Sequence, residues 1–323
     1  MIRARFGKDF DMDTLLNYFS SLPGAVAQGI IAGIMAIGVY ITYRVLDVAD
    51  LTVDGSYCTG AAVCAAMLIN GHSVWVAMLV AMLAGMVAGL ITGFFHTFMG
   101  IPAILSGILT QLMLWSINLK IMGIALGKVS AAVIAVSSRN YKLLASMLKM
   151  GDTLLVLAIF SVILIAVLYW FFGTEYGATL RATGDNPQMS RALGINTDIR
   201  KIMGLVLSNG IVALAGSLLA QYQGNAEINM GRGAIVTGFA AVIIGEALLG
   251  KLTKNNFALK LFAVIVGGIV YFIIYSTIIY LGVESNYLKM LSALVLACFL
   301  AVPYWKTRFA KHAKRSNVTK GEP

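Results

Sequence analysis

Long runs of apolar residues without charge constrain the fold of this chain more than any other feature. About 20 such residues in a helix span the roughly 30 Å hydrocarbon core of a bilayer. We expect long spans at 22–43, 72–94, 101–123, 152–172, 201–222, 258–280 and 287–304, and two shorter ones at 56–70 and 234–249. The runs therefore predict nine crossings of a membrane.

The composition supports the same fold class. Of the 323 residues, 59% are hydrophobic and 12% are charged, whereas soluble domains carry about 25% charged residues. This excludes a soluble enzyme, a nucleic-acid reader and a disulfide-rich secreted domain. The segment 124–150 is ambiguous, because its apolar stretch 129–136 is too short to span and could be re-entrant or a surface helix. We therefore expect an all-α polytopic membrane protein with eight to ten transmembrane helices.

The charge distribution predicts the sidedness of the chain. The segment 305–323 forms a basic tail with six basic residues and one acidic residue, half of the net charge of +10. Cytoplasmic loops are enriched in Lys and Arg, so the tail and the loop 173–200 are expected in the cytoplasm. Residues 1–21 form a polar N-terminal segment without the apolar core of a signal peptide, and 13–21 could be a short interfacial helix. The membrane domain then covers 22–304.

Two of the expected helix pairs share an unusual design, in which a polar, glycine-containing break precedes a short span. The breaks are 47–55 and 224–233, and a shift of 178 residues aligns Gly55 with Gly233 in the common pattern G-x-x-x-T-G-x-A. On the expected topology the two breaks face opposite sides, which predicts an inverted repeat. Inverted repeats with discontinuous helices are typical of transporters. The alternative is a chance match between small residues.

Small residues also predict close helix packing. Gly85, Gly89 and Gly93 form one ridge along a helix face, and Gly29 with Gly33 form another. Such ridges let helix backbones approach closely in membranes. We favour packing within one subunit over a seam between two copies.

The loop 173–200 has the features of a docking surface. Its sequence predicts two short helices, Gly177–Thr183 and 187–193, outside the membrane. Asp185 or Asn186 can cap the second helix, Pro187 suits its first position and Gly194 suits the residue after its end. A capped pair of helices of this kind presents side chains to a soluble partner.

The motif G-x-x-L-R-A-x-G-D-N-P-x-x-[AS]-R-x-x-G-I-N in this loop resembles the coupling loop of bacterial ABC importer permeases of the branched-chain amino acid and ribose superfamily. The stretch from Gly33 to Ser56 resembles the same superfamily, nearest to a sub-branch of tryptophan-type or uncharacterised-substrate permeases. The resemblance covers roughly 22–303. The coupling residues that it implies are Gly177, Arg181, Gly184, Asp185, Asn186, Pro187, Arg191 and Gly194.

The resemblance also implies the partners and the location of the chain. A homodimer in the bacterial cytoplasmic (inner) membrane would bind a cytoplasmic ABC ATPase at each coupling loop. An extracytoplasmic solute-binding protein would deliver the solute. ATP and magnesium would bind the ATPase, so no cofactor is expected in this chain, and the chain would not be an enzyme.

Polar residues within the apolar segments are the candidates for the translocation path. Asp47, Asp50 and Asp54 would share one face if their segment is helical, where they could line a gate or cap an unwound segment. The alternative is a wet cytoplasmic turn in which Arg44 pairs with Asp47. The other candidates are Gly55, Gln111, Trp115, Asn118, Asn225, Glu227 and Asn229.

Three of these candidates lie on one helix. Gln111, Trp115 and Asn118 are spaced i, i+4, i+7, so they share a face of the predicted helix 101–123. A polar and aromatic face inside a span suits an amphipathic solute such as an aromatic amino acid. The alternative is hydrogen bonding between helices. Glu246, near the end of its span, is expected to be structural and to pair with Lys251.

The sequence contains no pattern for catalysis or metal binding. The three histidines are far apart, and Cys58, Cys64 and Cys298 lie in apolar segments. The segment 123–130 departs from the phosphate-loop spacing G-x-x-x-x-G-K-[ST]. We therefore predict a permease subunit of an ATP-driven importer for a small organic solute, an amino acid of aromatic or branched-chain type. The alternatives are a sugar or nucleoside permease and an ion-coupled secondary transporter.

Overall fold

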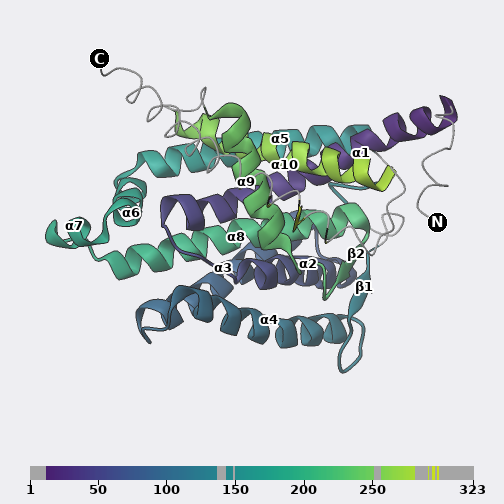
Figure 1. The fold of residues 1–323 in the computed structure, drawn as a ribbon. Helices are drawn as coiled ribbons and strands as arrows, with labels where there is room; N and C mark the ends of the chain where they lie inside the picture. The colour runs from purple at the N-terminus through teal and green to yellow at the C-terminus, as the bar shows by residue number, and fades with distance from the viewer. Residues whose placement is uncertain are drawn as a thin grey trace, which may run out of the picture.

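The computed structural model describes residues 12–136, 143–147, 150–250 and 256–280, together with 290, 293, 294 and 297. Six of the described helices are long and apolar enough to cross a membrane. They are α1 (Met12–Tyr40) with the π-helical turn η2 (Ile41–Val45), α3 (Val74–Thr97), α4 (Ala103–Ala125), α5 (Met150–Gly173), α8 (Thr197–Gln223) and α10 (Phe257–Tyr280). Figure 1 shows them side by side as a bundle. The fold is the expected all-α polytopic membrane protein.

Two further apolar helices are too short to span a bilayer alone. They are α2 (Val53–Ile69) and α9 (Ala234–Leu249), and a non-helical segment precedes each of them. The expected discontinuous helices are therefore present, whereas the inverted repeat stays a prediction. The expected span 287–304, apart from four isolated positions, and the tail 305–323 lie outside the described residues.

The ambiguous segment 124–150 contains a strand, so the surface helix considered for 129–136 is wrong, whereas a re-entrant path stays a prediction. Strand β1 (Val133–Ala135) pairs antiparallel with β2 (Asn225–Glu227), which follows α8. Ile134 is fully buried at the centre of this ladder, and β-branched residues favour such pleated, half-buried positions. The ladder lies at the end of the bundle opposite to α6 (Glu175–Asp185) and α7 (Pro187–Ala192) (Figure 1).

A separate interfacial helix at 13–21 is also not found, because α1 runs without a break from Met12 to Tyr40. Aromatic contacts hold its first turns on the bundle. The hydroxyls of Tyr18 and Thr277 share a hydrogen bond of 2.8 Å, and the rings of Tyr18 and Tyr280 lie 5.0 Å apart. These contacts fix the start of the candidate span Tyr18–Val45 against the end of α10.

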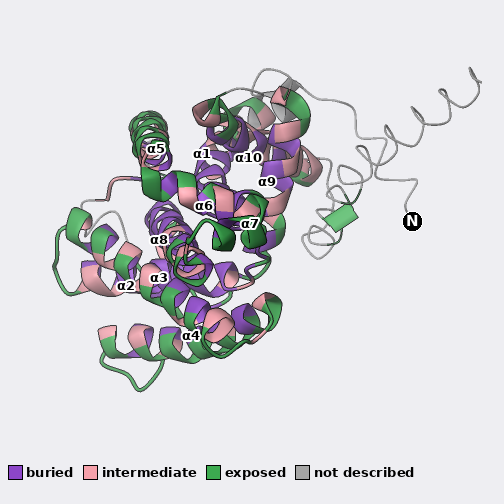
Figure 2. Ribbon diagram, turned by 90° about the vertical axis from the view of Figure 1, so that its left-hand side faces the viewer, coloured by how far each residue is buried: buried purple, intermediate pink, exposed green. Residues whose placement is uncertain are grey.

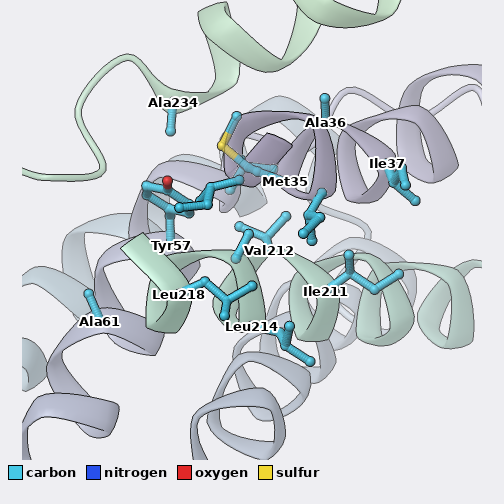
Figure 3. Packing of buried hydrophobic residues seen from close by; sticks show 14 of the residues in the cluster. Met35, Ala36, Ile37, Tyr57, Ala61, Ile211, Val212, Leu214, Leu218 and Ala234 are labelled. Atoms are coloured by element: carbon cyan, nitrogen blue, oxygen red, sulfur yellow. The ribbon is translucent and has the colours of Figure 1, made fainter. Parts of the chain in front are cut away.

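Helix α8 lies at the centre of the bundle, against α1, α2 and α3 (Figure 2). In the close view of Figure 3, Met35 of α1, Tyr57 of α2, Val212 and Leu218 of α8, and Ala234 of α9 meet in one apolar cluster. The most apolar stretch of α1 is 83% buried, whereas that of α5 is 17% buried. Helix α5 therefore leaves most of its surface uncovered by the rest of the subunit, and α1 with α8 forms the core.

The glycine ridges pack inside this subunit, as expected. A side chain at Gly85 or Gly89 of α3 would meet backbone of α8 at Asn209 or Leu205. Gly29 of α1 similarly faces the backbone of α10. Because these neighbours are main-chain atoms, they cannot move aside as a flexible side chain can.

We expect Gly89→Ala to lower the thermal unfolding temperature in detergent, because the added methyl group would overlap the Leu205 carbonyl. Overpacking of this kind costs about 1–3 kcal/mol. Gly151→Ala in the first turn of α5 is the matched control, since no atom lies within 4 Å of the added carbon. Equal unfolding temperatures for the two variants would contradict this account of the α3–α8 contact.

Candidate functional site

A cavity of about 260 Å³ lies between the start of α2, the middle of α4 and the segment that leads into α9. It brings together five of the residues expected along the path, and it confirms that Gln111, Trp115 and Asn118 share one face. The lining consists of Asp54, Gly55, Cys58, Gln111, Leu112, Trp115, Asn118, Ile228 and Arg232.

The wall of this cavity is held together by Asp54, which caps a helix distant in the sequence. Its Oδ1 accepts a hydrogen bond of 2.9 Å from the Ile235 amide, and its Oδ2 accepts one of 3.1 Å from the Gly233 amide. Gly233, with φ +87°, is the residue before α9 and has no side-chain oxygen to cap it. Asp54 therefore supplies both the acceptors and the negative charge that a helix N-terminus favours.

The first break is not helical, so Asp47, Asp50 and Asp54 do not share a face. Asp47 has φ +54°, a conformation that Asp tolerates better than most residues. It is exposed, whereas Asp50 is buried. The Asp50 carboxylate accepts hydrogen bonds from the Thr52 amide at 2.9 Å and from Asn209 Nδ2 at 2.7 Å. Asp50 thus fixes the unwound segment to α8 and does not line the cavity.

A buried polar network continues from this point. Asn209 Oδ1 accepts a hydrogen bond of 2.6 Å from the Ser56 hydroxyl. The hydroxyls of Thr52 and Thr92 lie 2.7 Å apart, and Thr92 donates to Thr110 at 2.9 Å. These bonds link α2, α3, α4 and α8 around the break. Buried polar groups require such partners, so the network holds the half-helix α2 at a fixed place in the bundle.

The ion pairs expected for Arg44 and Glu246 differ from those observed. Arg44 pairs with Glu246 of α9 through two hydrogen bonds of 2.8 and 2.7 Å, so its expected pair with Asp47 is wrong. The pair expected for Glu246 was Lys251, which lies outside the described residues. This ion pair connects η2 with α9.

The second break contributes different residues from those expected. Asn225 and Glu227 belong to β2, and Asn229 lies in the turn that follows, away from the cavity lining. Instead, Ile228 and Arg232 line the cavity together with Cys58 and Leu112 of α2 and α4. Arg232, a basic residue in a break between apolar segments, carried the same sequence signal as Asn225, Glu227 and Asn229. The apolar lining residues carried no signal of their own.

The lining combines opposite charges with aromatic and amide groups. Asp54 is a carboxylate and Arg232 a guanidinium, and both border the same cavity. Asp54 uses two of its roughly four acceptor positions on α9. The accessible fraction of Trp115 is 45%, whereas that of Asn118 is 1%. Such a lining can bind a small solute that carries both charges and an apolar body.

The loop between α5 and α8 forms the two helices expected of a docking surface. Thr174 accepts from the Gly177 amide at 3.4 Å and starts α6, which is longer than expected. Asn186 accepts from the Met189 amide at 3.0 Å and caps α7, with Pro187 in its first position. Gly194, with φ +79°, follows its end. The capping residues are therefore confirmed.

The loop residues divide into two groups. Arg181 donates to the Phe172 carbonyl at 2.9 Å and lies over the Phe257 ring, and Gly184 touches the Val45 carbonyl. These two residues attach α6 to the membrane body. By contrast, Met189 is 62% and Leu193 70% exposed, on and beside α7 at one tip of the molecule (Figure 1).

Other residues of the loop are exposed but locally paired. Arg191 donates to the Thr197 hydroxyl at 2.8 Å and lies 3.4 Å from Asp198. Asp185 and Pro187 are exposed beside it. Within the described part of the chain, no three His, Cys, Asp or Glu side chains are grouped as a metal site would require.

Comparisons with known proteins agree over most of the length. The family model described as branched-chain amino acid transport system, permease component, matches residues 22–300. A tyrosine transport system permease protein of Clostridioides difficile is 42% identical over 286 residues, 87% of this chain and 91% of that protein. An uncharacterized protein of Rickettsia prowazekii is 34% identical over 273 residues, 84% of this chain and 94% of that protein. A nucleoside ABC transporter permease protein of Lactococcus lactis is 32% identical over 114 residues, 34% of this chain and 36% of that protein.

Proposed function

We propose that this chain, which belongs to the branched-chain amino acid transport system permease family, forms the translocation path of an ATP-driven importer for an amino acid. The family membership supports the role in transport. The relative from Clostridioides difficile, whose name states tyrosine transport, supports the class of solute.

One structural observation carries the choice of an amino acid. The cavity halfway along α4 has the Asp54 carboxylate and the Arg232 guanidinium in one lining. An amino acid at neutral pH carries an ammonium and a carboxylate, which match these two groups. The volume of the cavity, about 260 Å³, is slightly below the roughly 300–1,000 Å³ of pockets for drug-sized ligands. The cavity therefore suits a small solute.

The two ends of the bundle suggest where the partners of the importer would bind. The exposed α7 would dock the ABC ATPase, and the α6–α7 end and the C-terminus would then face the cytoplasm. The β1–β2 end would then receive the solute from an extracytoplasmic binding protein. A second copy of the chain would complete the path in the inner membrane. ATP with magnesium would be bound and hydrolysed by the ATPase, and this chain would supply the path and the coupling surface.

The test is uptake of labelled L-tyrosine into proteoliposomes that contain the chain with its copurified ATPase and binding protein. We expect uptake only when hydrolysable ATP is on the ATPase side, and unlabelled L-tyrosine should compete. Proteoliposomes without ATPase are the control. Uptake that needs no ATP would contradict the importer assignment.

Two alternatives have an observation of their own. The local similarity to a nucleoside permease favours a nucleoside, and competition by adenosine or ribose instead of amino acids would support that class. The buried Asp50 carboxylate is a group that an ion-coupled carrier could use. Uptake driven by a proton or sodium gradient, with no ATPase present, would favour that carrier.

A further inference from the structure

We infer that Asn118 is a specificity residue of the permease itself, which binds a polar atom at the far end of the solute's aromatic side chain. The preferred solute would then be a hydroxylated aromatic amino acid such as tyrosine over phenylalanine. This inference rests on the proposed function, because it assigns the solute class at the same cavity.

The main observation is an amide without partners. Both Asn118 Nδ2 and Oδ1 are buried and have no hydrogen-bond partner among the described residues, although the side chain borders the cavity. The neighbouring Cys58 thiol is close enough to interact with Asn118, but it also lies 3.5 and 3.4 Å from the carbonyls of Glu227 and Ile228, and a thiol is only a weak donor and acceptor. Because a buried polar group without a partner is costly, the unpaired amide indicates a ligand that completes it.

The length of the cavity agrees with a solute that is polar at both ends. Gly55, which follows Asp54, packs against Gln111, since an added Cβ there would lie 3.2 Å from Gln111 Cα. Asn118 is seven residues further along α4, a rise of about 10 Å. The charged group and the unpaired amide therefore lie at different levels, with Trp115 on the same face between them.

This arrangement matches tyrosine group by group. Asp54 would bind the ammonium, Arg232 the carboxylate, and Trp115 the aromatic ring, for which an offset or edge-on ring contact is favourable. The phenol hydroxyl can donate to Asn118 Oδ1 and accept from Nδ2. Phenylalanine would leave both amide atoms unpaired, and sites built to bind a hydroxyl reject the analogue that lacks it.

The experiment measures direct binding of L-tyrosine and L-phenylalanine to the purified full-length chain by isothermal titration calorimetry. We expect the wild type to bind tyrosine about tenfold more tightly or better. Asn118→Leu, which is similar in volume, should bring the ratio of the two Kd values close to one. Ser116→Leu, an exposed position on the same helix, is the matched control and should keep the preference.

A second measurement separates recognition from folding. Because Asn118→Leu removes an unpaired buried amide, its thermal unfolding temperature should equal or exceed that of the wild type. A lower unfolding temperature with an unchanged preference would identify Asn118 as a structural residue and overturn the inference. Equal binding of the two amino acids by the wild type, or no binding of either, would overturn it as well.

The outcomes for the two proposals are distinguishable. ATP-driven uptake with unchanged tyrosine preference in Asn118→Leu would refute the inference alone. Uptake without ATP would refute the importer assignment, while loss of the preference in the same variant would still support the role of Asn118.

Discussion

Asp54→Ala should abolish amino acid uptake and destabilise α9, which is one of the two largest effects that we expect. The variant removes the acceptors of the Gly233 and Ile235 amides at the start of α9. Loss of a capping residue costs about 0.5–2 kcal/mol in soluble proteins. The variant leaves both N–H groups without their acceptor, so a cost in this range is expected here. It also removes the carboxylate that would bind the solute's ammonium.

Asp54→Asn separates the two contributions. Its amide keeps one acceptor oxygen for α9 but has no charge, so its unfolding temperature should lie between those of the wild type and Asp54→Ala. Binding of L-tyrosine should weaken at least about tenfold, as the loss of one charge-assisted hydrogen bond implies. Asp47→Ala in the same break is the control, since Asp47 is exposed. Full uptake by Asp54→Ala would exclude Asp54 from the path.

Much of the fold could be predicted because it depends on local sequence. The apolar runs locate the six long helices, since length and composition alone decide whether a helix can cross a bilayer. The caps at Asn186 and Pro187 were predictable for the same reason, because a cap acts within three residues of its helix. Helical spacing also correctly placed Gln111, Trp115 and Asn118 on one face.

The features that could not be predicted from the sequence depend on contacts between distant segments. Asp54 and Ile235 are 181 residues apart, and Arg44 and Glu246 are 202 residues apart, so no local pattern could pair them. The pairing of β1 with β2 likewise joins residues on either side of two long helices. The segment before α2 is not helical, because Asp50 accepts a hydrogen bond from the amide two residues later, which favours a turn.

The same physical requirement applies to both breaks. An unwound segment inside a membrane must satisfy its backbone groups within the protein. At the first break Asp50 and the network around Asn209 do so. At the second break the need is met by Asp54, which belongs to the first. The short helices α2 and α9 therefore depend on each other. A substitution at either break should alter the cavity between them.

Met189→Asp combined with Leu193→Asp should abolish copurification of the ATPase and ATP-driven uptake, the second of the largest effects. Both side chains are more than 60% exposed at the tip of the molecule, and the proposed ATPase interface would bury them. Burying two carboxylates in such an interface without partners would cost several kcal/mol. The measurement is the ratio of ATPase to permease after purification, followed by uptake.

The same variant should leave the membrane body unchanged, because neither side chain is buried in the bundle. Its unfolding temperature and its binding of L-tyrosine should match those of the wild type. Val129→Asp is the matched control, since Val129 is 83% exposed in the segment before β1 and should not affect the ATPase. Gly184→Trp would not be a clean test of docking, because a side chain there would collide with the Val45 carbonyl. ATPase binding that survives both Asp substitutions would place the coupling surface elsewhere than α7.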